Sequence, residues 1–314
     1  MVCHNCKVEA KKHGRDRKGH RRFRCVTCSK TFVEQYDKPL GNMYLPIDRA
    51  IGVLNLLAEG CSIRSTERLT GINRNTIMGL LVFVGERCER LLENRVKDVL
   101  VRDVQADELW SFVQCKEKTK TRNGKDDVRI GDAYCFVGIE RHTKLVLAWH
   151  LGRRTTADTF AFTEKLDHAT KGNFQLTTDG FAPYRDAVVH SLGAKKIDFA
   201  QLVKVYGASR EGEQRYSPAK IIDAVPVPIY GNPDPERICT SHVERQNLTI
   251  RMQMRRLTRL TNGFSKKWEN LKAAFAFFFA HYNFCRVHSS IRVTPAMEAG
   301  ITDHIWTLGE LITR

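Results

Sequence analysis

Four cysteines near the N-terminus have the spacing of a metal site. Cys3 and Cys6 form one C-x-x-C pair, Cys25 and Cys28 form a second, and eighteen residues separate the two pairs. Two such turns present four thiolates, and a hairpin between them closes a tetrahedron around Zn²⁺. Disulfide pairing or a chance spacing is the alternative, and a cytosolic setting disfavours disulfides. The spacing therefore predicts a structural zinc site at these four cysteines.

A second group of candidate residues consists of acids in an apolar context. Asp107 and Glu108 interrupt a run of aliphatic, β-branched and aromatic residues, 104–113, that is typical of a strand. An ionised carboxylate buried there is costly unless a cation, a protonated partner or a metal neutralises it. The alternative is that both acids lie on the solvent face of an edge strand, and it is the later acids of the chain that favour burial.

Two later acids lie at the ends of predicted elements. Asp179 closes a predicted strand and precedes a glycine, so it lies where α/β sheets place ligands; a simple Asp-Gly turn is the alternative. Glu244 follows Ser241 by three residues, which is the spacing of a capping box. The same helix continues with Arg251 and Arg255, a basic surface for a nucleic-acid backbone. Divalent cations would resolve the repulsion between these acids and a polyanion.

The net charge of the chain indicates a polyanionic partner. Its 314 residues include 51 Lys and Arg against 35 Asp and Glu, a formal net charge of +16. Each cation that neutralises a phosphate releases counterions, so nucleic acid is the expected partner and an anionic membrane surface the weaker alternative. The most apolar run, 273–280, is far shorter than the about 20 residues that span a bilayer. With no secretory signal apparent, we expect a cytoplasmic protein that works on DNA or RNA, with no membrane partner.

The four cysteines need a small β scaffold to bring them together. We expect residues 1–38 to form a zinc ribbon. Basic residues dominate the stretch between the cysteine pairs, and Arg21 and Arg22 are candidate phosphate contacts there. A charge run of this kind is alternatively a solvated face.

Residues 45–97 carry the pattern of three helices. Apolar residues recur at helical spacing, Ser62 can begin the second helix, and Asn73 can cap the third after a glycine turn. This order predicts a helix-turn-helix domain, in which Arg74 and Asn75 at the start of the third helix reach base edges in a major groove. Ordinary three-helix packing is the alternative.

The acids require a sheet that gathers them. Residues 100–262 contain a meander of three predicted strands followed by alternating helix and strand, which predicts a mixed α/β sheet. Within this core, 207–239 is rich in proline and is either an insertion that contacts DNA or a surface loop. Residues 263–314 form a C-terminal helical tail whose apolar face we expect to pack against the sheet.

Several separate motifs resemble one family of bacterial proteins. They are Asp107-Glu108-Leu109-Trp110-Ser111-Phe112-Val113, Thr178-Asp179-Gly180 with Tyr184, and Glu244-Arg245-Gln246-Asn247-Leu248 with Arg251, Arg256, Leu257, Phe264, Ser265 and Lys266. Together they are similar to the insertion sequence 1 family of transposases, as is the order of zinc ribbon, helix-turn-helix and core. The resemblance covers most of the chain. The chain departs from the family in two ways. Its DNA-binding and catalytic parts lie in one continuous reading frame, whereas the family often encodes them in two, and residues 207–239 form a longer stretch than the family core is expected to have.

The resemblance implies an α/β RNase H-like core, a mixed five-stranded sheet with helices, in which Asp107, Asp179 and Glu244 are catalytic. By this resemblance Asp107 bridges two Mg²⁺ or Mn²⁺ ions, while Asp179 and Glu244 each hold one. Glu108 is expected to be a neighbour and not a ligand, because it points to the opposite face of the strand.

The same resemblance implies a transposase acting in the bacterial cytoplasm on double-stranded DNA. Such a protein binds the terminal inverted repeats of an insertion sequence, frees a 3′-OH at the element end, and joins it to target DNA. It would act as a homo-oligomer, at least a dimer, because two element ends are handled together. The alternatives are a non-catalytic DNA-binding regulator derived from a transposase and a nuclease that cleaves without joining.

Overall fold

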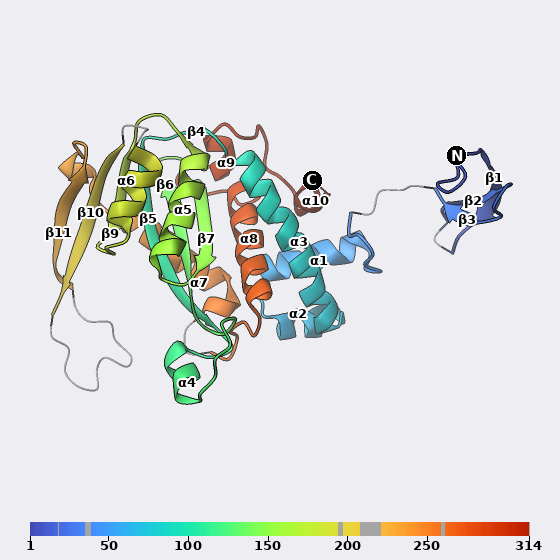
Figure 1. The fold of residues 1–314 in the computed structure, drawn as a ribbon, viewed down its shortest axis with the longest axis horizontal. Coiled ribbons are helices and arrows are strands. Elements are labelled where there is room, and N and C mark those ends of the chain that lie inside the picture. The colour runs from blue at the N-terminus through green and yellow to red at the C-terminus, as the bar shows by residue number, and fades with distance from the viewer. Residues whose placement is uncertain (18, 35–38, 194–196, 208–220, 259–260, 314) are drawn as a thin grey trace. The chain divides into compact units, whose positions relative to one another are not determined.

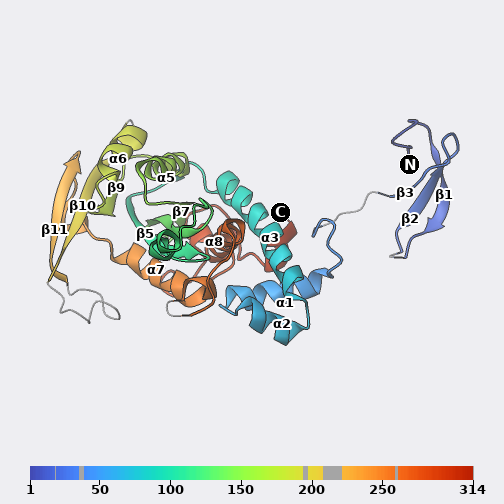
Figure 2. The same cartoon turned by 60° about the horizontal axis from the view of Figure 1, so that its bottom comes forward.

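The computed structural model describes residues 1–17, 19–34, 39–193, 197–207, 221–258 and 261–313. They form two compact units, Met1–Met43 and Tyr44–Arg314, whose elements are labelled in Figures 1 and 2. Across these ranges no helix is both long enough and apolar enough to cross a bilayer. Each unit contains its own β-sheet.

The N-terminal unit is a three-stranded antiparallel sheet. Its strands are β1 (Ala10–Arg15), β2 (Arg21–Cys25) and β3 (Thr31–Val33), with β2 in the centre. Phe23 of β2 is buried and stacks on Phe32, with ring centroids 6.0 Å apart. So small an apolar core stabilises a sheet poorly by itself, which makes a cross-link between the cysteines structurally important.

Three helices begin the larger unit, and local caps set their ends. They are α1 (Ile47–Ala58), α2 (Ile63–Thr70) and α3 (Arg74–Arg95). The Ser62 hydroxyl accepts the Ser65 N–H at 3.0 Å, and the Asn73 side chain accepts the Asn75 N–H at 2.8 Å. Gly71, with a φ of 67°, adopts the left-handed conformation that ends α2. The three expected helices, with their caps at Ser62 and Asn73, are thereby confirmed.

The third of these helices packs along α8 (Trp268–Phe284), which is distant in the sequence (Figure 1). Gly85 of α3 lies so close to Ala273 of α8 that a Cβ at Gly85 would be 2.5 Å from the Ala273 Cβ. Arg87 Nη1 donates to the Ile312 carbonyl at 2.6 Å, which ties α3 to α10 (Leu308–Thr313). The first three helices and the C-terminal helices therefore share one core.

A six-stranded mixed sheet forms the rest of this unit, in the order β11-β10-β9-β5-β6-β7. Its strands are β5 (Asp103–Val113), β6 (Gly131–Glu140), β7 (Val146–Gly152), β9 (Gln175–Asp179), β10 (Asp198–Tyr206) and β11 (Ile221–Tyr230). β6 is antiparallel to both of its neighbours, β5 and β7, whereas β9 is parallel to both β5 and β10. The mixed α/β class is confirmed, and the expected number of five strands is wrong.

The additional strand, β11, lies inside the proline-rich stretch 207–239. It pairs antiparallel with β10, and its Pro226 and Pro228 lie opposite Leu202 and Ala200. Proline has no N–H to donate, so within a sheet it is tolerated on an edge strand whose missing donors face away from the partner. β11 is an edge strand of this kind. Ten residues of the stretch are therefore part of the sheet.

Helices cover both faces of the sheet, as Figure 2 shows. α5 (Thr156–Ala169) and α6 (Tyr184–Leu192) lie together on one face, where Phe136, Phe162 and Tyr184 pack with ring centroids 5.7 to 6.3 Å apart. α7 (Ser241–Gln253) packs against β5 and β6. The short elements are β4 (Val99–Leu100), α4 (Glu117–Arg122), β8 (Thr170–Lys171), η3 (Pro235–Arg237), η4 (Arg255–Leu257) and α9 (Pro295–Glu298).

Candidate metal centres and nucleic-acid interface

Three carboxylates meet where β5 lies beside β9. Asp107 and Glu108 are consecutive in β5, and Asp179 is the last residue of β9, whose register sets Thr178 beside Ala106. Carboxylate oxygens of the three acids lie within 4.8 Å of one another. Open α/β sheets present ligands at the carboxyl ends of their parallel strands, which is where β9 ends. The structure thus brings Asp107 and Asp179 together.

Glu108 belongs to this acidic cluster even though, as expected, it points to the opposite face of β5 from Asp107. The strand does alternate: Asp107 Oδ2 accepts from Asn247 Nδ2 of α7 at 2.9 Å, whereas Glu108 interacts with Tyr184 of α6. Asp179, however, lies one residue beyond the last residue of β9 that pairs with β5. Its carboxylate is therefore within reach of both faces of β5, which explains why Glu108 joins the cluster although it points away from Asp107. That Glu108 is a neighbour of the metal ligands and not itself a ligand stays a prediction.

Glu244 lies in the first turn of α7, outside the acidic cluster. Its Oε1 accepts a hydrogen bond from the Thr240 hydroxyl at 2.6 Å and another from the Lys204 ammonium. Residues three apart share a helix face, and Asn247, three residues after Glu244, makes the direct contact with Asp107. The helix thus turns the face that carries Glu244 toward β5. Asn247 lies within the quoted motif, but sequence reasoning gave it no role.

Burial and mutual repulsion change the acidity of two members of the cluster. Burial, and after it the negative charge of Asp179, raises the pKa of Asp107 to about 6; Glu244 adds to the same effect. Burial and the charge of Asp179 also raise the pKa of Glu108 to about 8. Glu108 therefore holds a proton at neutral pH, whereas Asp107 is mostly ionised.

Two cations that sequence reasoning did not single out pair with the acids. Arg154 donates from Nε to Glu108 Oε2 at 3.0 Å and from Nη2 to Asp179 Oδ2 at 3.3 Å. Lys204 of β10 pairs with Glu244. Each cation is 25 or more residues from the acids that it contacts, so no local pattern signals either pair. Only the assembled sheet brings them together.

The donor set of the acidic cluster fits a hard divalent cation. Carboxylate oxygens are the ligands preferred by Mg²⁺ and Mn²⁺. Two oxygens bound to one Mg²⁺ at about 2.1 Å lie at most about 4.2 Å apart. Oxygens of Asp107, Glu108 and Asp179 already lie within 4.8 Å of one another, so small side-chain rotations suffice. The cluster is therefore a candidate metal site.

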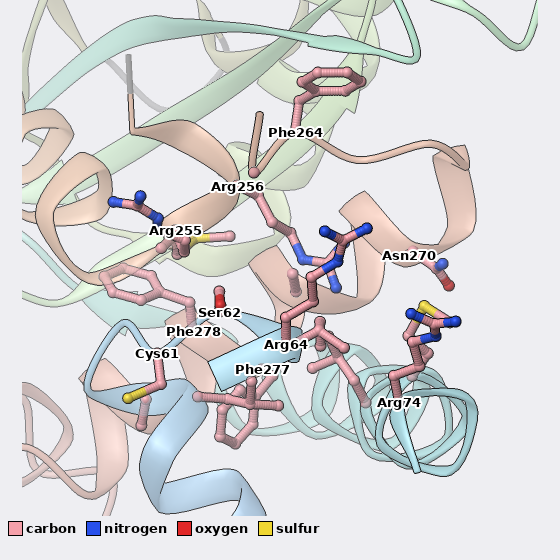
Figure 3. Close-up of a pocket in the computed structure, with 18 of the residues that line it drawn as sticks. Cys61, Ser62, Arg64, Arg74, Arg255, Arg256, Phe264, Asn270, Phe277 and Phe278 are labelled. Atoms are coloured by element: carbon pink, nitrogen blue, oxygen red, sulfur yellow. The ribbon is translucent and has the colours of Figure 1, made fainter. Parts of the chain in front are cut away.

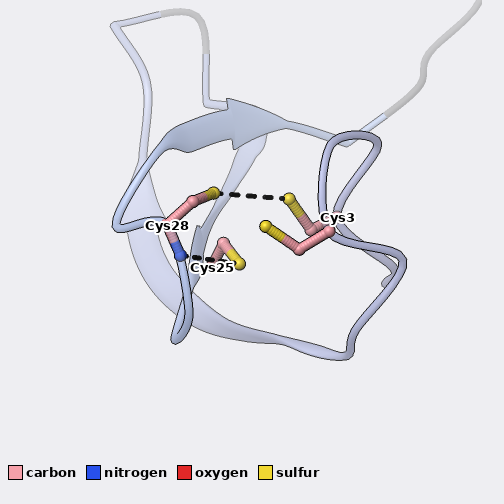
Figure 4. A group of neighbouring side chains, drawn as sticks. Cys3, Cys25 and Cys28 are labelled. Atoms are coloured by element: carbon pink, nitrogen blue, oxygen red, sulfur yellow. Dashed lines mark hydrogen bonds between the residues drawn. The ribbon is translucent and has the colours of Figure 1, made fainter.

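The cysteines of the N-terminal unit form a second candidate metal site (Figure 4). The sulfurs of Cys3, Cys6, Cys25 and Cys28 lie within 4.8 Å of one another, and those of Cys3 and Cys28 are 3.7 Å apart. A disulfide bond is about 2.05 Å long. Two thiolates bound at about 2.3 Å to one tetrahedral Zn²⁺ lie about 3.8 Å apart. The observed spacing fits zinc ligation, and all four cysteines are free of disulfides.

Backbone N–H groups favour the metal-binding form of Cys25. The N–H groups of Cys28 and Thr27 point at Cys25 Sγ, at 3.5 and 3.4 Å. The Cys28 N–H is the main reason why the pKa of Cys25 falls to about 6. Because the thiolate is the form that ligates a metal, the turn prepares this cysteine for binding.

The predicted DNA-binding residues divide between the two units. They are Arg21 and Arg22 on β2, Arg74 and Asn75 in the first turn of α3, Arg251 in α7 and Arg255 in η4. Arg21, Arg74, Asn75 and Arg255 are exposed. Arg74 and Arg255 line the same open cavity (Figure 3), so helices α1–α3 and the segment after α7 share a basic surface.

No protein-family model matches the chain, and no curated protein matches it. Among solved structures, the chain is similar to endonuclease V from Bacillus subtilis. That similarity has 12% sequence identity, covers 65% of this chain and 90% of that chain, and has a TM-score of 0.22. A TM-score this low does not establish a shared fold. The roles of the acids and cysteines therefore rest on the geometry of this chain.

Proposed function

We propose that this chain is a DNA transposase that cleaves and joins DNA strands with the help of divalent metal ions. The observation that carries the proposal is the cluster of Asp107, Glu108 and Asp179, packed against the helix that bears Glu244. Acids gathered in a chain with a net charge of +16 suit phosphoryl transfer on a polyanion.

The strand order supports the same proposal. An antiparallel meander, β5-β6-β7, is followed by β9 and β10 in parallel on the other side of β5. This is the arrangement expected of an RNase H-like core, with β11 added at its edge. Asp107 on the central strand and Asp179 on its parallel neighbour match the first two acids of the insertion sequence 1 transposase pattern.

In this proposal the side chains have distinct roles. Asp107 and Asp179 would hold the metal ions, and Glu244 would complete the set once its pairing with Lys204 is broken. Bound Mg²⁺ or Mn²⁺ would activate the attacking oxygen and stabilise the leaving one. Glu108, protonated at neutral pH, can donate a hydrogen bond to a phosphate oxygen. Arg154, released from the carboxylates, can then pair with the DNA backbone.

DNA binding would use both units of the chain. Arg21 and Arg22 on the cysteine-bearing sheet would contact phosphates, and Arg74 with Asn75 would read the terminal inverted repeats. Arg251 and Arg255 follow Glu244 along the chain and would hold the strand near the acids. Two element ends must be joined to one target, so the active form would be a homo-oligomer, at least a dimer.

The test is strand cleavage and joining on a labelled end of the native element, with Mg²⁺ or Mn²⁺. We expect Asp107→Asn, Asp179→Asn and Glu244→Gln to bind DNA but neither cleave nor join it. Asp186→Asn is the matched control, because this acid is exposed on α6. A wild type that binds but never cuts, or triad variants that cut normally, would overturn the proposal.

A second candidate is a non-catalytic DNA-binding regulator. The pairing of Arg154 with Glu108 and Asp179, and of Lys204 with Glu244, favours it, because these cations occupy the carboxyl groups without a metal. Such a protein would bind DNA with equal affinity in the presence and absence of Mg²⁺ and would show no cleavage. Cleavage without joining would instead identify a nuclease.

A further inference from the structure

An open cavity of about 840 Å³ lies between the first three helices and the segment that follows α7. Residues of α1, α2 and α3 line one side, and residues 254–256, 262–264 and 266 with part of α8 line the other. Figure 3 shows arginine side chains from both sides around this space. The acidic cluster does not contribute to its lining, so the cavity is a separate site.

The charge of this lining is entirely positive. Its cationic side chains are Arg64, Arg74, Arg255, Arg256 and Lys266, and no described Asp or Glu lines the cavity. Within the described ranges none of the five forms an ion pair. Like charges gathered around one space repel one another. An anion bound between them removes that cost.

The most direct sign of a ligand is Arg256. Its Nη1 donates to the Ser265 hydroxyl at 3.0 Å, but its buried Nη2 has no hydrogen-bond partner among the described residues. Burial lowers the pKa of this guanidinium to about 10. A buried, charged donor without a partner is costly, and the bidentate fork of arginine suits a phosphate. The unused donor of Arg256 therefore indicates an anion.

The same cavity also has an aromatic wall. Phe264, Phe277 and Phe278 belong to its lining, so a ligand would meet ring surface as well as positive charge. Rings next to arginines are the combination that binds nucleotides, because bases stack on rings while phosphates pair with cations. The first residues of α2 and α3 also line the cavity, where the helix dipoles favour negative charge.

We propose that this cavity binds a phosphate-bearing nucleotide unit of a DNA strand. Arg64 from α2 and Arg256 from η4 would bind the phosphate, and the base or sugar would pack against the phenylalanine rings. The inference rests on the proposed DNA partner but not on the proposed catalysis. It assigns the bound strand a fixed point between the first three helices and the segment that follows α7.

The test compares two exposed arginines of one helix in the full-length chain. Arg64 and Arg68 are both exposed on α2, but only Arg64 lines the cavity. Binding of a fluorescein-labelled DNA strand is measured by anisotropy without added divalent metal. We expect Arg64→Gln and Arg256→Gln to weaken binding about tenfold or more, and Arg68→Gln to leave it within about twofold. Equal weakening by Arg64→Gln and Arg68→Gln would overturn the site, because general surface charge would explain it.

The source of the phosphate is tested by competition. Against the labelled strand, a deoxynucleoside monophosphate should compete better than inorganic phosphate, because only the nucleotide also contacts the rings. The cavity would instead bind free nucleotides if two results were found together. A monophosphate would protect Arg256 from an arginine-modifying reagent, and the DNA affinity would be unchanged in Arg64→Gln and Arg256→Gln. Those two results would overturn the DNA assignment.

Thermal unfolding distinguishes a binding role of Arg256 from a structural one. Because its Nη2 lacks a partner among the described residues, Arg256→Gln should melt at or above the wild-type temperature without DNA, and Arg256→Lys should keep part of the affinity. A marked fall in melting temperature for Arg256→Gln would show that the side chain serves folding and would overturn the inference. If DNA binding depended on Arg64 and Arg256 as expected but the chain never cleaved DNA, only the proposed catalysis would be overturned.

Discussion

Glu108 is the side chain whose protonation state depends most on its burial and on the charges around it. It lies in the central strand, its carboxyl group contacts Arg154, and the charge of Asp179 is close by. With a pKa of about 8, it carries a proton under the conditions in which Asp107, with a pKa of about 6, has largely lost its own. Two consecutive acids in one strand therefore differ in charge state, which allows one to ligate a cation while the other donates a hydrogen bond.

The raised pKa of Glu108 predicts how stability depends on pH. An unfolded Glu titrates near about 4.3, so between about 4.3 and about 8 the folded chain holds a proton that the unfolded chain has released. Stability without divalent metal should therefore fall as pH rises through this window. Glu108→Gln, which cannot ionise, should show a shallower fall between about pH 5 and about pH 8 in urea unfolding.

The matched control for this pH dependence is Glu236→Gln, because Glu236 is exposed. That variant should reproduce the wild-type slope. The explanation fails if Glu108→Gln has the same slope as wild type, since the proton held by the folded chain would then be on another group.

At the scale of single elements, the packing of α3 on α8 depends on one glycine. A Cβ at Gly85 would lie 2.5 Å from the Ala273 Cβ and 2.6 Å from the Ala273 carbonyl oxygen, so α8 would have to move. We expect Gly85→Ala to lower the free energy of unfolding by about 1–3 kcal/mol in urea denaturation. Gly79→Ala, on the same helix with nothing within 4 Å, should be neutral or stabilising by up to about 1 kcal/mol. If both variants behaved alike, the close packing would be refuted.

The three-stranded element of the N-terminal unit yields a prediction about metal content. Its buried core is small, so the four thiolates should hold it together through zinc. Purified wild-type protein should contain about one zinc per chain, and Cys25→Ser should contain much less. Cys115→Ser, which alters a half-buried cysteine outside the group, should keep the metal. Full zinc content in Cys25→Ser would contradict the four-thiolate site.

Local signals explain which elements could be predicted from the sequence. The caps at Ser62 and Asn73 and the turn at Gly71 act within a few residues, so the helix boundaries could be predicted from the sequence. The group of four cysteines could be predicted for the same reason, because each C-x-x-C pair is a local pattern. β11 was not, because its two prolines normally argue against a strand and its position at a sheet edge is a tertiary property.

The site was only partly predictable because its members come from distant segments. Asp107 and Asp179 carried local signals, an acid in an apolar strand and an acid at a strand end. Glu108 shared the first of these signals, but its place beside Asp179 depends on where β9 stops. Arg154 and Lys204 carried no local signal, since their roles depend on which cations the folded sheet places beside the acids. The alternation of side chains along a strand predicts on which face of that strand a residue lies. It does not predict which of these residues a side chain at the end of a neighbouring strand, such as Asp179, can contact.

At the scale of the whole molecule, the net charge of +16 predicts salt-sensitive DNA binding. The logarithm of the binding constant should fall linearly with the logarithm of salt concentration. Replacing both Arg21 and Arg22 by Gln should reduce that slope by about 0.9 for each phosphate that the variant no longer neutralises. Arg129→Gln is the control, because Asp127 already pairs with that guanidinium at 3.0 Å. An unchanged slope in the double variant would exclude the N-terminal sheet from the DNA interface.

The prolines of β11 have a consequence for how copies of this chain can associate. An exposed edge strand with apolar side chains, here Ile221, Ile222 and Val225, ordinarily offers its backbone as a template on which a second chain can add a strand. Pro226 and Pro228 remove two donors from that template. The strand therefore protects the protein from edge-to-edge aggregation. Extension of the sheet by a second chain at β11 is thereby disfavoured, and a homo-oligomer of this chain would use another surface.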